Sequence, residues 1–469
     1  MRYVALASDY DGTLAVDGLV TRDTLQALER LRGSGRKAIL VTGRELPDLL
    51  HVFPEIELFD HVVAENGAVL YCPSTKAERL LAEPPPPEFA LKLAEKGVTP
   101  LGIGRVIVAT REPHEQVMLE LIRELGLELH LIFNKGAVMA LPANVNKTTG
   151  LTEALAELKL SPRNIAAVGD AENDHIFLSE CECAVAVANA LPALKERADW
   201  VTEDARGAGV TELIDHLVGD DLAFLQPRLT RHRLPIGLAG GDELYLEPYG
   251  RNVLLAGPTG SGKSTMAALM LGRLSERGYQ YVLTDPDGAC KPAEGAVILG
   301  DRRQPPAENA ILQLLEQPKQ NVVLNLTALA GDAFPAFLLG LLPKLEKLRA
   351  KTGRPHWLVL DGAERLLPTD TPGVEARRVP RLSSTLLITS EPEHVHASAL
   401  RLADTAIAMA QHGRETLAAV SRALHEPLPL VPKDPGGSTA LWWDRRARSS
   451  PRWLRVQAAP AAETPPVRR

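Results

Sequence analysis

The stretch YVALASDYDGTL (residues 3–14) decides the fold of the first half of the chain. Residues 3–8 are mostly apolar, as in a buried strand, and two aspartates, Asp9 and Asp11, follow directly. Gly12 allows the chain to turn away sharply after them. Open α/β sheets bind their ligands at the carboxyl ends of their strands. The stretch therefore predicts a strand that presents two carboxylates to a site at the edge of a sheet.

Strand-like and helix-like runs alternate through residues 1–216, which predicts an α/β fold with a parallel sheet. Further strands are expected at 37–42, 61–64, 165–168 and 184–187. Four prolines at 84–87 interrupt the alternation, and a βαββ pattern follows them. We expect this insert, about residues 82–143, to form a small α/β cap.

The residues at the expected strand ends are those that phosphate-ester chemistry requires. A carboxylate such as Asp9 can attack phosphorus and form an aspartyl-phosphate, and its neighbour Asp11 can protonate the leaving oxygen and later deprotonate water. Thr42 offers a hydroxyl to a phosphoryl oxygen, and Lys147 offsets negative charge. We also expect Gly43, Arg44 and Asn173 to contact the phosphate or the substrate.

Two further aspartates, Asp170 and Asp174, follow the strand expected at 165–168. Carboxylates, water and substrate phosphate are the oxygen ligands that Mg²⁺ prefers, so the set Asp9, Asp11, Asp170 and Asp174 predicts a Mg²⁺ site.

These motifs (DxDGT, a strand-terminal Thr, a Lys and GDxxxD) resemble those of the haloacid-dehalogenase superfamily of phosphatases. The resemblance covers about residues 1–216 and implies a Rossmannoid core with Asp9 as nucleophile and Asp11 as acid/base. It also implies that Asp170 and Asp174 hold Mg²⁺ together with Asp9 and the Asp11 carbonyl. The stretch ENGA (65–68) and the position of the insert resemble the subgroup with a type-two cap, which implies small sugar phosphates, phosphoglycolate or related metabolites as substrates.

The second half carries GPTGSGKST (257–265) between an expected strand, 252–256, and a helix. Backbone N–H groups of such a loop surround a β-phosphate, Lys263 would contact the β/γ-phosphates, and Ser264 would hold Mg²⁺. The partner acid is Asp361, at the end of the strand expected at 357–360. The predicted ATP-binding residues are Gly257, Pro258, Thr259, Gly260, Ser261, Gly262, Lys263, Ser264, Thr265 and Asp361.

Residues 234–430 resemble the HerA/FtsK branch of P-loop ATPases, which implies a RecA/HerA-like domain. That family usually has Asp-Glu at the end of the strand that carries the partner acid, and the Glu polarises water. Here Gly362 follows Asp361, and the next acid is Glu364. The sequence therefore predicts ATP binding, with Glu364 as the candidate for ATP hydrolysis. Arg377, Arg378 and Arg381 are candidate arginine fingers across a subunit interface, although surface arginines are the commoner explanation.

Composition argues against a secreted, membrane-spanning, zinc-ribbon or collagen-like protein. Of 469 residues, 45% are hydrophobic and 24% charged, which is ordinary for a globular protein with sizeable cores. Four cysteines form neither a CxxC pair nor a disulfide framework. We expect no signal peptide, no membrane-spanning segment and a cytoplasmic location. Residues 1–220 carry a net charge of −13 and the rest +6, which indicates two modules.

We expect a linker at 217–233 and a basic, Trp-containing tail at 431–469, most of it poorly ordered. The stretch WWDRRAR (442–448), with Trp453 and Arg455, combines aromatic and basic residues in a composition that suits stacking on bases, but its tryptophans could equally dock onto their own domain. The leading function is a Mg²⁺-dependent phosphatase for a small metabolite, fused to an ATP-binding domain that could self-assemble. Two alternatives stay open: a nucleic-acid-processing ATPase whose phosphatase module acts on phosphorylated ends, and a nucleotide-sensing scaffold with weak ATPase activity.

Overall fold

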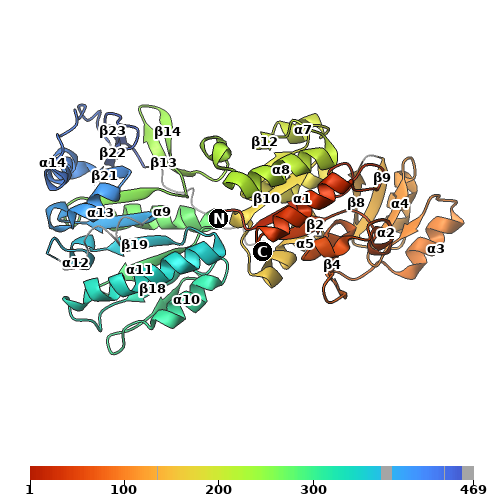
Figure 1. Cartoon of the computed structure of the whole chain (residues 1–469), viewed down its shortest axis with the longest axis horizontal. Helices are drawn as coiled ribbons and strands as arrows, with labels where there is room; N and C mark the ends of the chain where they lie inside the picture. Colours follow the sequence, from red (N-terminus) through yellow and green to blue (C-terminus); the bar gives the residue numbers. More distant parts are fainter. Residues whose placement is uncertain (135, 371–382, 438, 457–469) are drawn as a thin grey trace, which may run out of the picture. The chain divides into compact units, whose positions relative to one another are not determined.

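The protein, in a computed structural model, consists of two compact units, residues 1–230 (unit 1) and 231–469 (unit 2) (Figure 1). The structure describes residues 1–134, 136–370, 383–437 and 439–456. Within these residues, every helix is too short or too polar to cross a membrane.

Unit 1 is built on an eight-stranded sheet with the strand order β12-β11-β10-β1-β2-β3-β4-β5. Its strands are β1 (Ala5–Ser8), β2 (Lys37–Val41), β3 (His61–Ala64), β4 (Val69–Cys72), β5 (Ala77–Leu80), β10 (Ile165–Gly169), β11 (Cys183–Ala186) and β12 (Trp200–Val201). Strands β12 to β3 are parallel, whereas β4 and β5 are antiparallel. The predicted α/β fold with a parallel sheet is confirmed for this unit, and the five strands expected from the sequence are present to within two residues.

The helices of unit 1 cover the sheet and explain why its central strands are apolar throughout. They are α1 (Arg22–Gly33), α2 (Leu46–Val52), α5 (Lys147–Leu158), α6 (His175–Glu180), α7 (Pro192–Lys195) and α8 (Arg206–Asp220). Helix α1 packs beside α8 (Figure 1), and α5 packs against α6. A parallel strand with helices on both faces buries every side chain, and all four residues of β1 are buried.

The strand order brings the predicted site residues to one edge of the sheet. Strand β1 lies between β10 and β2, with Ala7 opposite both Ala167 and Ile39. Because all three strands are parallel, the residues that follow them, Asp9, Thr42 and Asp170, meet at the carboxyl edge.

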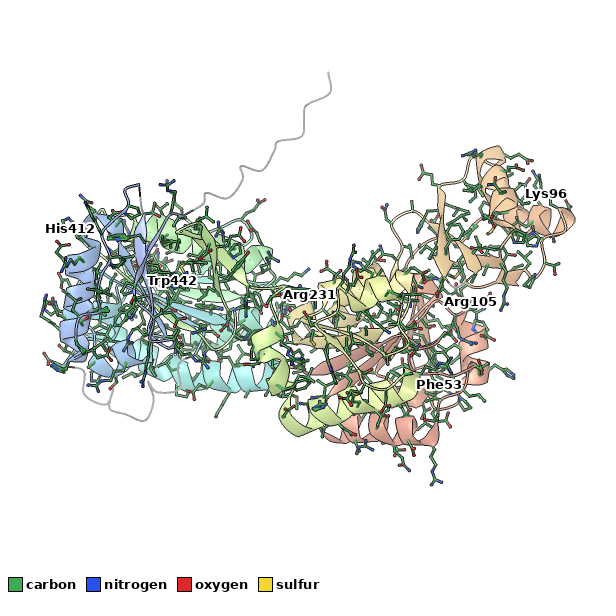
Figure 2. The ribbon with its side chains drawn as sticks, turned by 90° about the horizontal axis from the view of Figure 1, so that it is seen from above. Phe53, Lys96, Arg105, Arg231, His412 and Trp442 are labelled. Carbon is green, nitrogen blue, oxygen red and sulfur yellow. The ribbon has the colours of Figure 1, made fainter. Side chains whose placement is uncertain are left out.

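Residues 82–143 form a cap with its own apolar core, as Figure 2 shows around Lys96. Its elements are α3 (Pro87–Glu95), β6 (Gly102–Ile103), β7 (Val108–Arg111), α4 (Glu115–Glu124), β8 (Leu129–Asn134) and β9 (Ala137–Pro142). The four strands make an antiparallel sheet in the order β6-β7-β9-β8. The structure thus contains the βαββ pattern expected from the sequence and adds helix α3.

The expected linker at 217–233 is wrong in its extent. Helix α8 continues to Asp220, and a 3₁₀ helix, η5 (Ala223–Arg228), follows it. Leu217, Leu222 and Leu225 are buried in the core of unit 1. These apolar side chains bind the segment to unit 1, whose boundary lies at Thr230.

Unit 2 contains a nine-stranded sheet in the order β17-β18-β16-β19-β20-β15-β21-β22-β23. Its strands are β15 (Asn252–Ala256), β16 (Tyr281–Asp285), β17 (Val297–Leu299), β18 (Val322–Asn325), β19 (Trp357–Asp361), β20 (Thr385–Thr389), β21 (Thr405–Met409), β22 (Ala440–Asp444) and β23 (Arg452–Leu454). A separate hairpin is formed by β13 (Leu234–Ala239) and β14 (Asp242–Leu246). The helices are α9 (Lys263–Glu276), α10 (Glu308–Glu316), α11 (Ala333–Thr352), α12 (Ala363–Leu366), α13 (Ala397–Leu402) and α14 (Gly413–Leu424).

The prediction of a poorly ordered tail is wrong for residues 440–454, whereas residues 457–469 lie outside the described part of the chain. Strand β22 pairs antiparallel with β21, and β23 pairs with β22. Successive side chains of a strand point to opposite faces, so Trp442 is buried in one apolar cluster and Trp443 in another. The alternative that the tryptophans dock onto their own domain is therefore confirmed, and neither ring offers a free face for stacking on bases.

We expect Trp442→Ala to lower the free energy of unfolding of unit 2 by about 3–5 kcal/mol, because the variant leaves a large cavity in a packed core. Denaturant unfolding of the full chain, followed by intrinsic fluorescence, measures this change, since four of the five tryptophans lie in unit 2. Leu430→Ala is the control, because Leu430 is 85% exposed and its loss should cost less than about 0.5 kcal/mol. An equally small effect of both variants would contradict the buried position of β22.

Candidate active site

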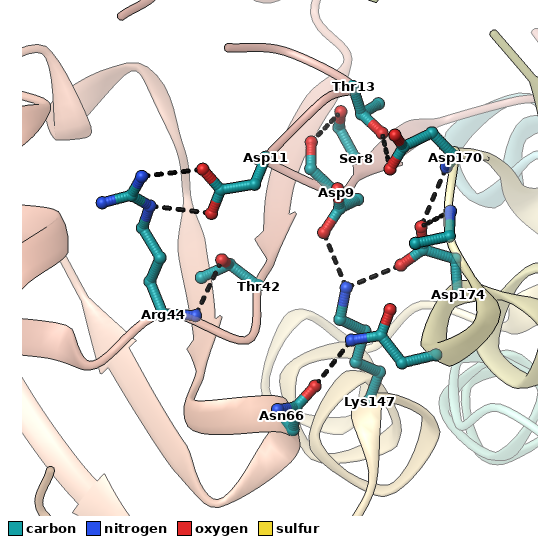
Figure 3. Close-up of polar contacts among 12 residues, drawn as sticks. Ser8, Asp9, Asp11, Thr13, Thr42, Arg44, Asn66, Lys147, Asp170 and Asp174 are labelled. Carbon is teal, nitrogen blue, oxygen red and sulfur yellow. Dashed lines mark hydrogen bonds and ion pairs between the residues drawn. The ribbon is translucent and has the colours of Figure 1, made fainter. Parts of the chain in front are cut away.

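A buried lysine bridges two carboxylates at the centre of the site (Figure 3). The Lys147 Nζ donates to Asp9 Oδ1 at 2.6 Å and to Asp174 Oδ1 at 2.6 Å. Lys147 is the first residue of α5, whose N-cap is Asn146. The dipole of a helix opposes a cation at its N-terminus, so the two carboxylates hold the amine there. The bridge joins the ends of β1 and β10 to the start of α5.

The loop after β10 positions Asp170 and Asp174. The Asp174 Oδ2 accepts hydrogen bonds from the backbone N–H groups of Asp170 and Ala171, both at 2.9 Å. A side chain at Gly169 would collide with Asp174, because its Cβ would lie 2.7 Å from that carboxylate. The Asp170 carboxylate lies within reach of the Thr13 hydroxyl, which donates to its Oδ1 at 3.4 Å.

Asp11 points to the other side of the site, toward Arg44. The guanidinium binds both Asp11 oxygens at 2.7 Å and also donates to Asp48 Oδ2 at 2.6 Å. Thr42 is buried. Its hydroxyl oxygen accepts a hydrogen bond from the backbone N–H of Arg44 at 3.1 Å, which leaves the hydroxyl proton available for donation to a ligand. Gly43 completes this turn at the wall of the cavity.

The turn Glu65-Asn66-Gly67 connects the core, the cap and the start of α5. All three residues have positive φ angles, and a Cβ on Gly67 would lie 1.9 Å from the Asn146 carbonyl oxygen. The buried Glu65 carboxylate accepts the N–H groups of Arg105 (2.8 Å), Val106 (2.8 Å) and Ile107 (3.1 Å) from the cap.

Asn66, at the centre of that turn, contacts the substrate-binding candidate Asn173. Its Oδ1 accepts from Asn173 Nδ2 at 2.9 Å. The Asn173 Oδ1 is buried and accepts no hydrogen bond from the described residues.

Burial and neighbouring charges leave the pKa of both members of the central pair above its ordinary value, for different reasons. Burial raises the pKa of Asp9 to about 7, the Asp174 carboxylate adds to the rise, and the Lys147 ammonium opposes it. Burial alone would lower the pKa of the Lys147 amine, but Asp174 and Asp9 outweigh it, so that the pKa lies above its ordinary value. The lysine is therefore charged at neutral pH.

The site fits a divalent cation. Asp9, Asp170 and Asp174 each offer a carboxylate oxygen, these oxygens lie within 4.8 Å of one another, and all three residues are buried. One lysine does not balance three buried carboxylates, and hard oxygen donors suit Mg²⁺. Asp11, the fourth aspartate predicted at the metal site, directs its carboxylate to Arg44, which leaves its backbone carbonyl as the group that the family resemblance assigns to the cation.

A cavity of about 560 Å³ lies between this centre and the cap. Its lining residues from the core are Asp9, Asp11, Gly43, Arg44, Glu45 and Asp48. The cap contributes Pro100, Gly102, Ile107, Ala109, Thr110, Arg111, Asn134, Ala137 and Met139. Its volume is in the range of sites for small molecules.

Unit 2 carries a second candidate site at the carboxyl edge of its own sheet. Residues 257–262 form a loop between β15 and α9, and Gly260 and Gly262 have φ angles of 79° and 94°, which favour glycine. The Lys263 Nζ donates to the carbonyl oxygens of Gly257 at 2.6 Å and Pro258 at 3.0 Å. The predicted residues Thr259, Ser264 and Thr265 are exposed on this loop and on the first turn of α9.

The predicted acids of unit 2 lie near that loop. Asp361 ends β19, which is separated from β15 by β20 alone. Gly362, with a φ of 69°, turns the chain into α12, on which Glu364 lies. The Glu364 Oε2 is buried and accepts no hydrogen bond from the described residues. Burial lowers the pKa of the Lys263 amine, whereas the Glu364 and Asp361 charges oppose this change.

The structure thus brings the candidates of unit 1 to one site and those of unit 2 to another. Arg377, Arg378 and Arg381 lie outside the described residues. Sequence reasoning missed Asn189, whose Nδ2 donates to the Gly12 carbonyl at 2.8 Å. It also missed the contact of Glu65 with the cap and every cap residue that faces the cavity. The quoted stretch ENGA was the one signal for Glu65.

Comparison with known proteins finds relatives that match unit 1. The family model of haloacid dehalogenase-like hydrolases matches residues 6–99 and 103–214. A phosphoglycolate phosphatase of Methanothermobacter thermautotrophicus is 32% identical over 226 residues, which are 46% of this chain and 99% of that protein. A phosphoglycolate phosphatase of Haloarcula marismortui is 31% identical over 225 residues, 45% of this chain and 95% of that protein.

A solved haloacid dehalogenase-like hydrolase from Bacteroides thetaiotaomicron has 16% identity and a TM-score of 0.41, covering 46% of this chain and 100% of that one. The residues matched by the family model lie in unit 1, whose parallel α/β core carries the carboxylate–lysine centre. Through this unit the chain belongs to the family of haloacid dehalogenase-like hydrolases. Unit 2 lies beyond the matched residues.

We expect the stability difference between Asp9→Asn and wild type to depend on pH when both proteins are stripped of metal with EDTA. A folded-state pKa of about 7 lies above the ordinary value of 3.8, so the folded wild type binds more protons than the unfolded chain between these values. The contribution of Asp9 to the stability of the wild type therefore falls as pH rises through this window. The asparagine variant lacks this contribution, because its side chain does not titrate. From pH 5 to pH 8, the free energy of unfolding of the variant should rise by about 2 kcal/mol relative to that of the wild type.

Unfolding of both proteins in denaturant at the two pH values measures this difference. Asp23→Asn, a change on the exposed first turn of α1, should show no such dependence. A difference between Asp9→Asn and wild type that stays constant with pH would contradict the raised pKa.

Proposed function

We propose that unit 1 is a Mg²⁺-dependent phosphomonoester hydrolase that acts through an aspartyl-phosphate on a small phosphorylated metabolite. The observation that carries this proposal is the Lys147 bridge between Asp9 and Asp174, of which Asp9 lines the cavity. Family membership supports the hydrolase class, and the relatives named phosphoglycolate phosphatase support a substrate of the phosphoglycolate or sugar-phosphate class.

In this proposal the Asp9 carboxylate attacks phosphorus, so that an oxygen–phosphorus bond forms and the ester bond breaks. Asp11 gives its proton to the leaving oxygen, and in the second step takes a proton from the water that attacks the aspartyl-phosphate. Asp9, Asp170 and Asp174 would hold Mg²⁺, which would supply positive charge at the phosphoryl oxygens. The ammonium of Lys147 and the hydroxyl of Thr42 stabilise the same developing charge from the protein side.

Arg44 has a further role in this scheme. It binds both oxygens of Asp11 in the structure, so that these oxygens are occupied by guanidinium N–H groups and are not free to contact a leaving group. A substrate phosphate is the stronger anion and competes for the same guanidinium. We infer that substrate binding draws Arg44 away from Asp11 and releases the carboxyl group for its acid role.

The test is hydrolysis of phosphoglycolate, sugar phosphates, nucleotides and 3′-phosphorylated oligonucleotides with Mg²⁺, by wild type and Asp9→Asn. We expect wild type to hydrolyse a small phosphomonoester and Asp9→Asn to lose at least about 10³-fold in kcat, because the nucleophile is absent. Asp23→Asn, on the surface, serves as the control. Full activity of Asp9→Asn would overturn the proposal, and preference for the oligonucleotides would favour action on nucleic-acid ends.

We propose as a second function that unit 2 binds ATP with Mg²⁺ at residues 257–265 and Asp361. The positive φ angles of Gly260 and Gly262 support this proposal, because they direct backbone N–H groups into the loop. The position of Glu364, with a buried and unpaired Oε2 among the described residues, supports a role for it in activating water. Four further points stay predictions: a role as a nucleotide-sensing scaffold, assembly into an oligomer, a nucleic-acid partner and a cytoplasmic location.

We expect Lys263→Ala to abolish ATP binding, measured by titration calorimetry, because the variant lacks the ammonium that contacts the β/γ-phosphates. Glu364→Gln should keep ATP binding and lower the rate of phosphate release by about 10²-fold or more. Glu276→Gln is the control, since Glu276 is exposed at the end of α9. ATP binding by wild type without measurable phosphate release would support the scaffold, and ATP binding by Lys263→Ala would contradict the second function.

A further inference from the structure

Three strands of the cap sheet align one polar row over the cavity. Strand β7 pairs with β9 so that Arg111 lies opposite Ala137, and β8 pairs with β9 so that Asn134 lies opposite the same alanine. Arg111 and Asn134 therefore occupy the two ends of one row, on either side of a small side chain. All three residues line the cavity that contains Asp9.

The next row on the same face is apolar. Ala109 lies opposite Met139, and both residues line the cavity. Side chains alternate along each strand, so residues such as Val108 and Val138 point to the other face and pack against the cap helices in the apolar core of the cap. Arg111 and Asn134 therefore bring charge and hydrogen-bonding groups to a wall that is otherwise mainly apolar.

The polar atoms of this row are free to bind a ligand. Arg111 makes no ion pair with any described residue, in contrast to Arg44, which is held by Asp11 and Asp48. The Asn134 Oδ1 is buried and accepts no hydrogen bond within the described part of the chain. Thr110 is the remaining polar cap residue with a side-chain hydroxyl in the lining, and its hydroxyl already donates to the Pro100 carbonyl at 2.7 Å.

We propose that Arg111 and Asn134 determine substrate specificity by binding the end of the substrate remote from its phosphate. The substrate class is a short phosphorylated hydroxy acid: its carboxylate pairs with the Arg111 guanidinium, and its hydroxyl donates to Asn134 Oδ1. This proposal rests on the phosphatase function of unit 1. It goes beyond that function by separating phosphorylated acids from neutral sugar phosphates.

The charges around the cavity favour a carboxylate at this row. The core wall carries the acids Asp9, Asp11, Glu45 and Asp48, so an anionic group on the substrate finds uncompensated positive charge on the cap side, at Arg111. A guanidinium matches a carboxylate with two parallel hydrogen bonds. A buried acceptor such as Asn134 Oδ1 costs free energy until a donor reaches it, so a substrate that lacks the hydroxyl is disfavoured.

Three probes separate these contributions: 2-phosphoglycerate has a carboxylate and a hydroxyl, phosphoglycolate lacks the hydroxyl, and glycerol 2-phosphate has a hydroxymethyl group in place of the carboxylate. We expect wild type to prefer 2-phosphoglycerate to glycerol 2-phosphate by about 10²-fold in kcat/KM. Arg111→Gln should remove most of this preference through a higher KM for both acids, and leave glycerol 2-phosphate within about threefold.

Asn134→Ala should lower kcat/KM for 2-phosphoglycerate by about tenfold and leave phosphoglycolate unchanged, because only the former has the hydroxyl. Arg123→Gln is the matched control, since Arg123 is an exposed arginine on helix α4 of the cap and lies outside the cavity lining. Equal losses on all three probes after Arg111→Gln would overturn the proposal, as would a wild-type preference for glycerol 2-phosphate or for a bisphosphate.

A binding measurement keeps this result distinct from failure of the phosphatase function. Calorimetric titration of 2-phosphoglycerate into Asp9→Asn protein, with and without Arg111→Gln, requires no turnover. An affinity that falls about tenfold or more with Arg111→Gln supports the row as the carboxylate site even when no hydrolysis occurs. An affinity that Arg111→Gln leaves unchanged contradicts it.

Discussion

The ion pairs of Lys147 with Asp9 and Asp174 are the interaction on which the rest of unit 1 depends. A buried amine is costly unless its charge is balanced, and two carboxylates at 2.6 Å supply that balance. The pairs are formed only when β1 and β10 are adjacent and parallel and when α5 begins at Lys147. Sheet order, helix start and loop conformation are thus tied to one cluster of charges, which is also the centre of the proposed chemistry.

The turn at Glu65-Asn66-Gly67 extends this cluster to the cap. Asn66 contacts Asn173, and Gly67 allows the turn to approach the N-cap of α5, next to Lys147. Glu65 binds three backbone N–H groups of the cap. One short segment with positive φ angles therefore fixes the cap relative to the catalytic candidates, which explains how an inserted domain can offer specificity residues to a site built by the core.

The sequence was sufficient for features that depend on local order along the chain. Strand ends followed by Asp9, Thr42 and Asp170 predict a shared edge, because parallel strands align their carboxyl ends. Features that depend on pairing between distant segments were not predictable. The row of Arg111 and Asn134 exists only through the register of three cap strands, and the burial of Trp442 depends on β22 finding the edge of β21. The composition from Leu430 onwards, rich in Pro, Gly, Ser, Ala and Arg, predicted a poorly ordered tail, because composition does not reveal that residues 440–444 pair with β21.

The attachment of Glu65 to residues 105–107 also has a consequence for substrate entry and product release. Separation of the cap from this point would leave a buried carboxylate and three amides without partners, at a cost of several kcal/mol. Strand β8 also contacts the core, at the segment Glu172–Asp174, so the cap is held at two places. Separation of the cap from the core would have to break the contacts at both places.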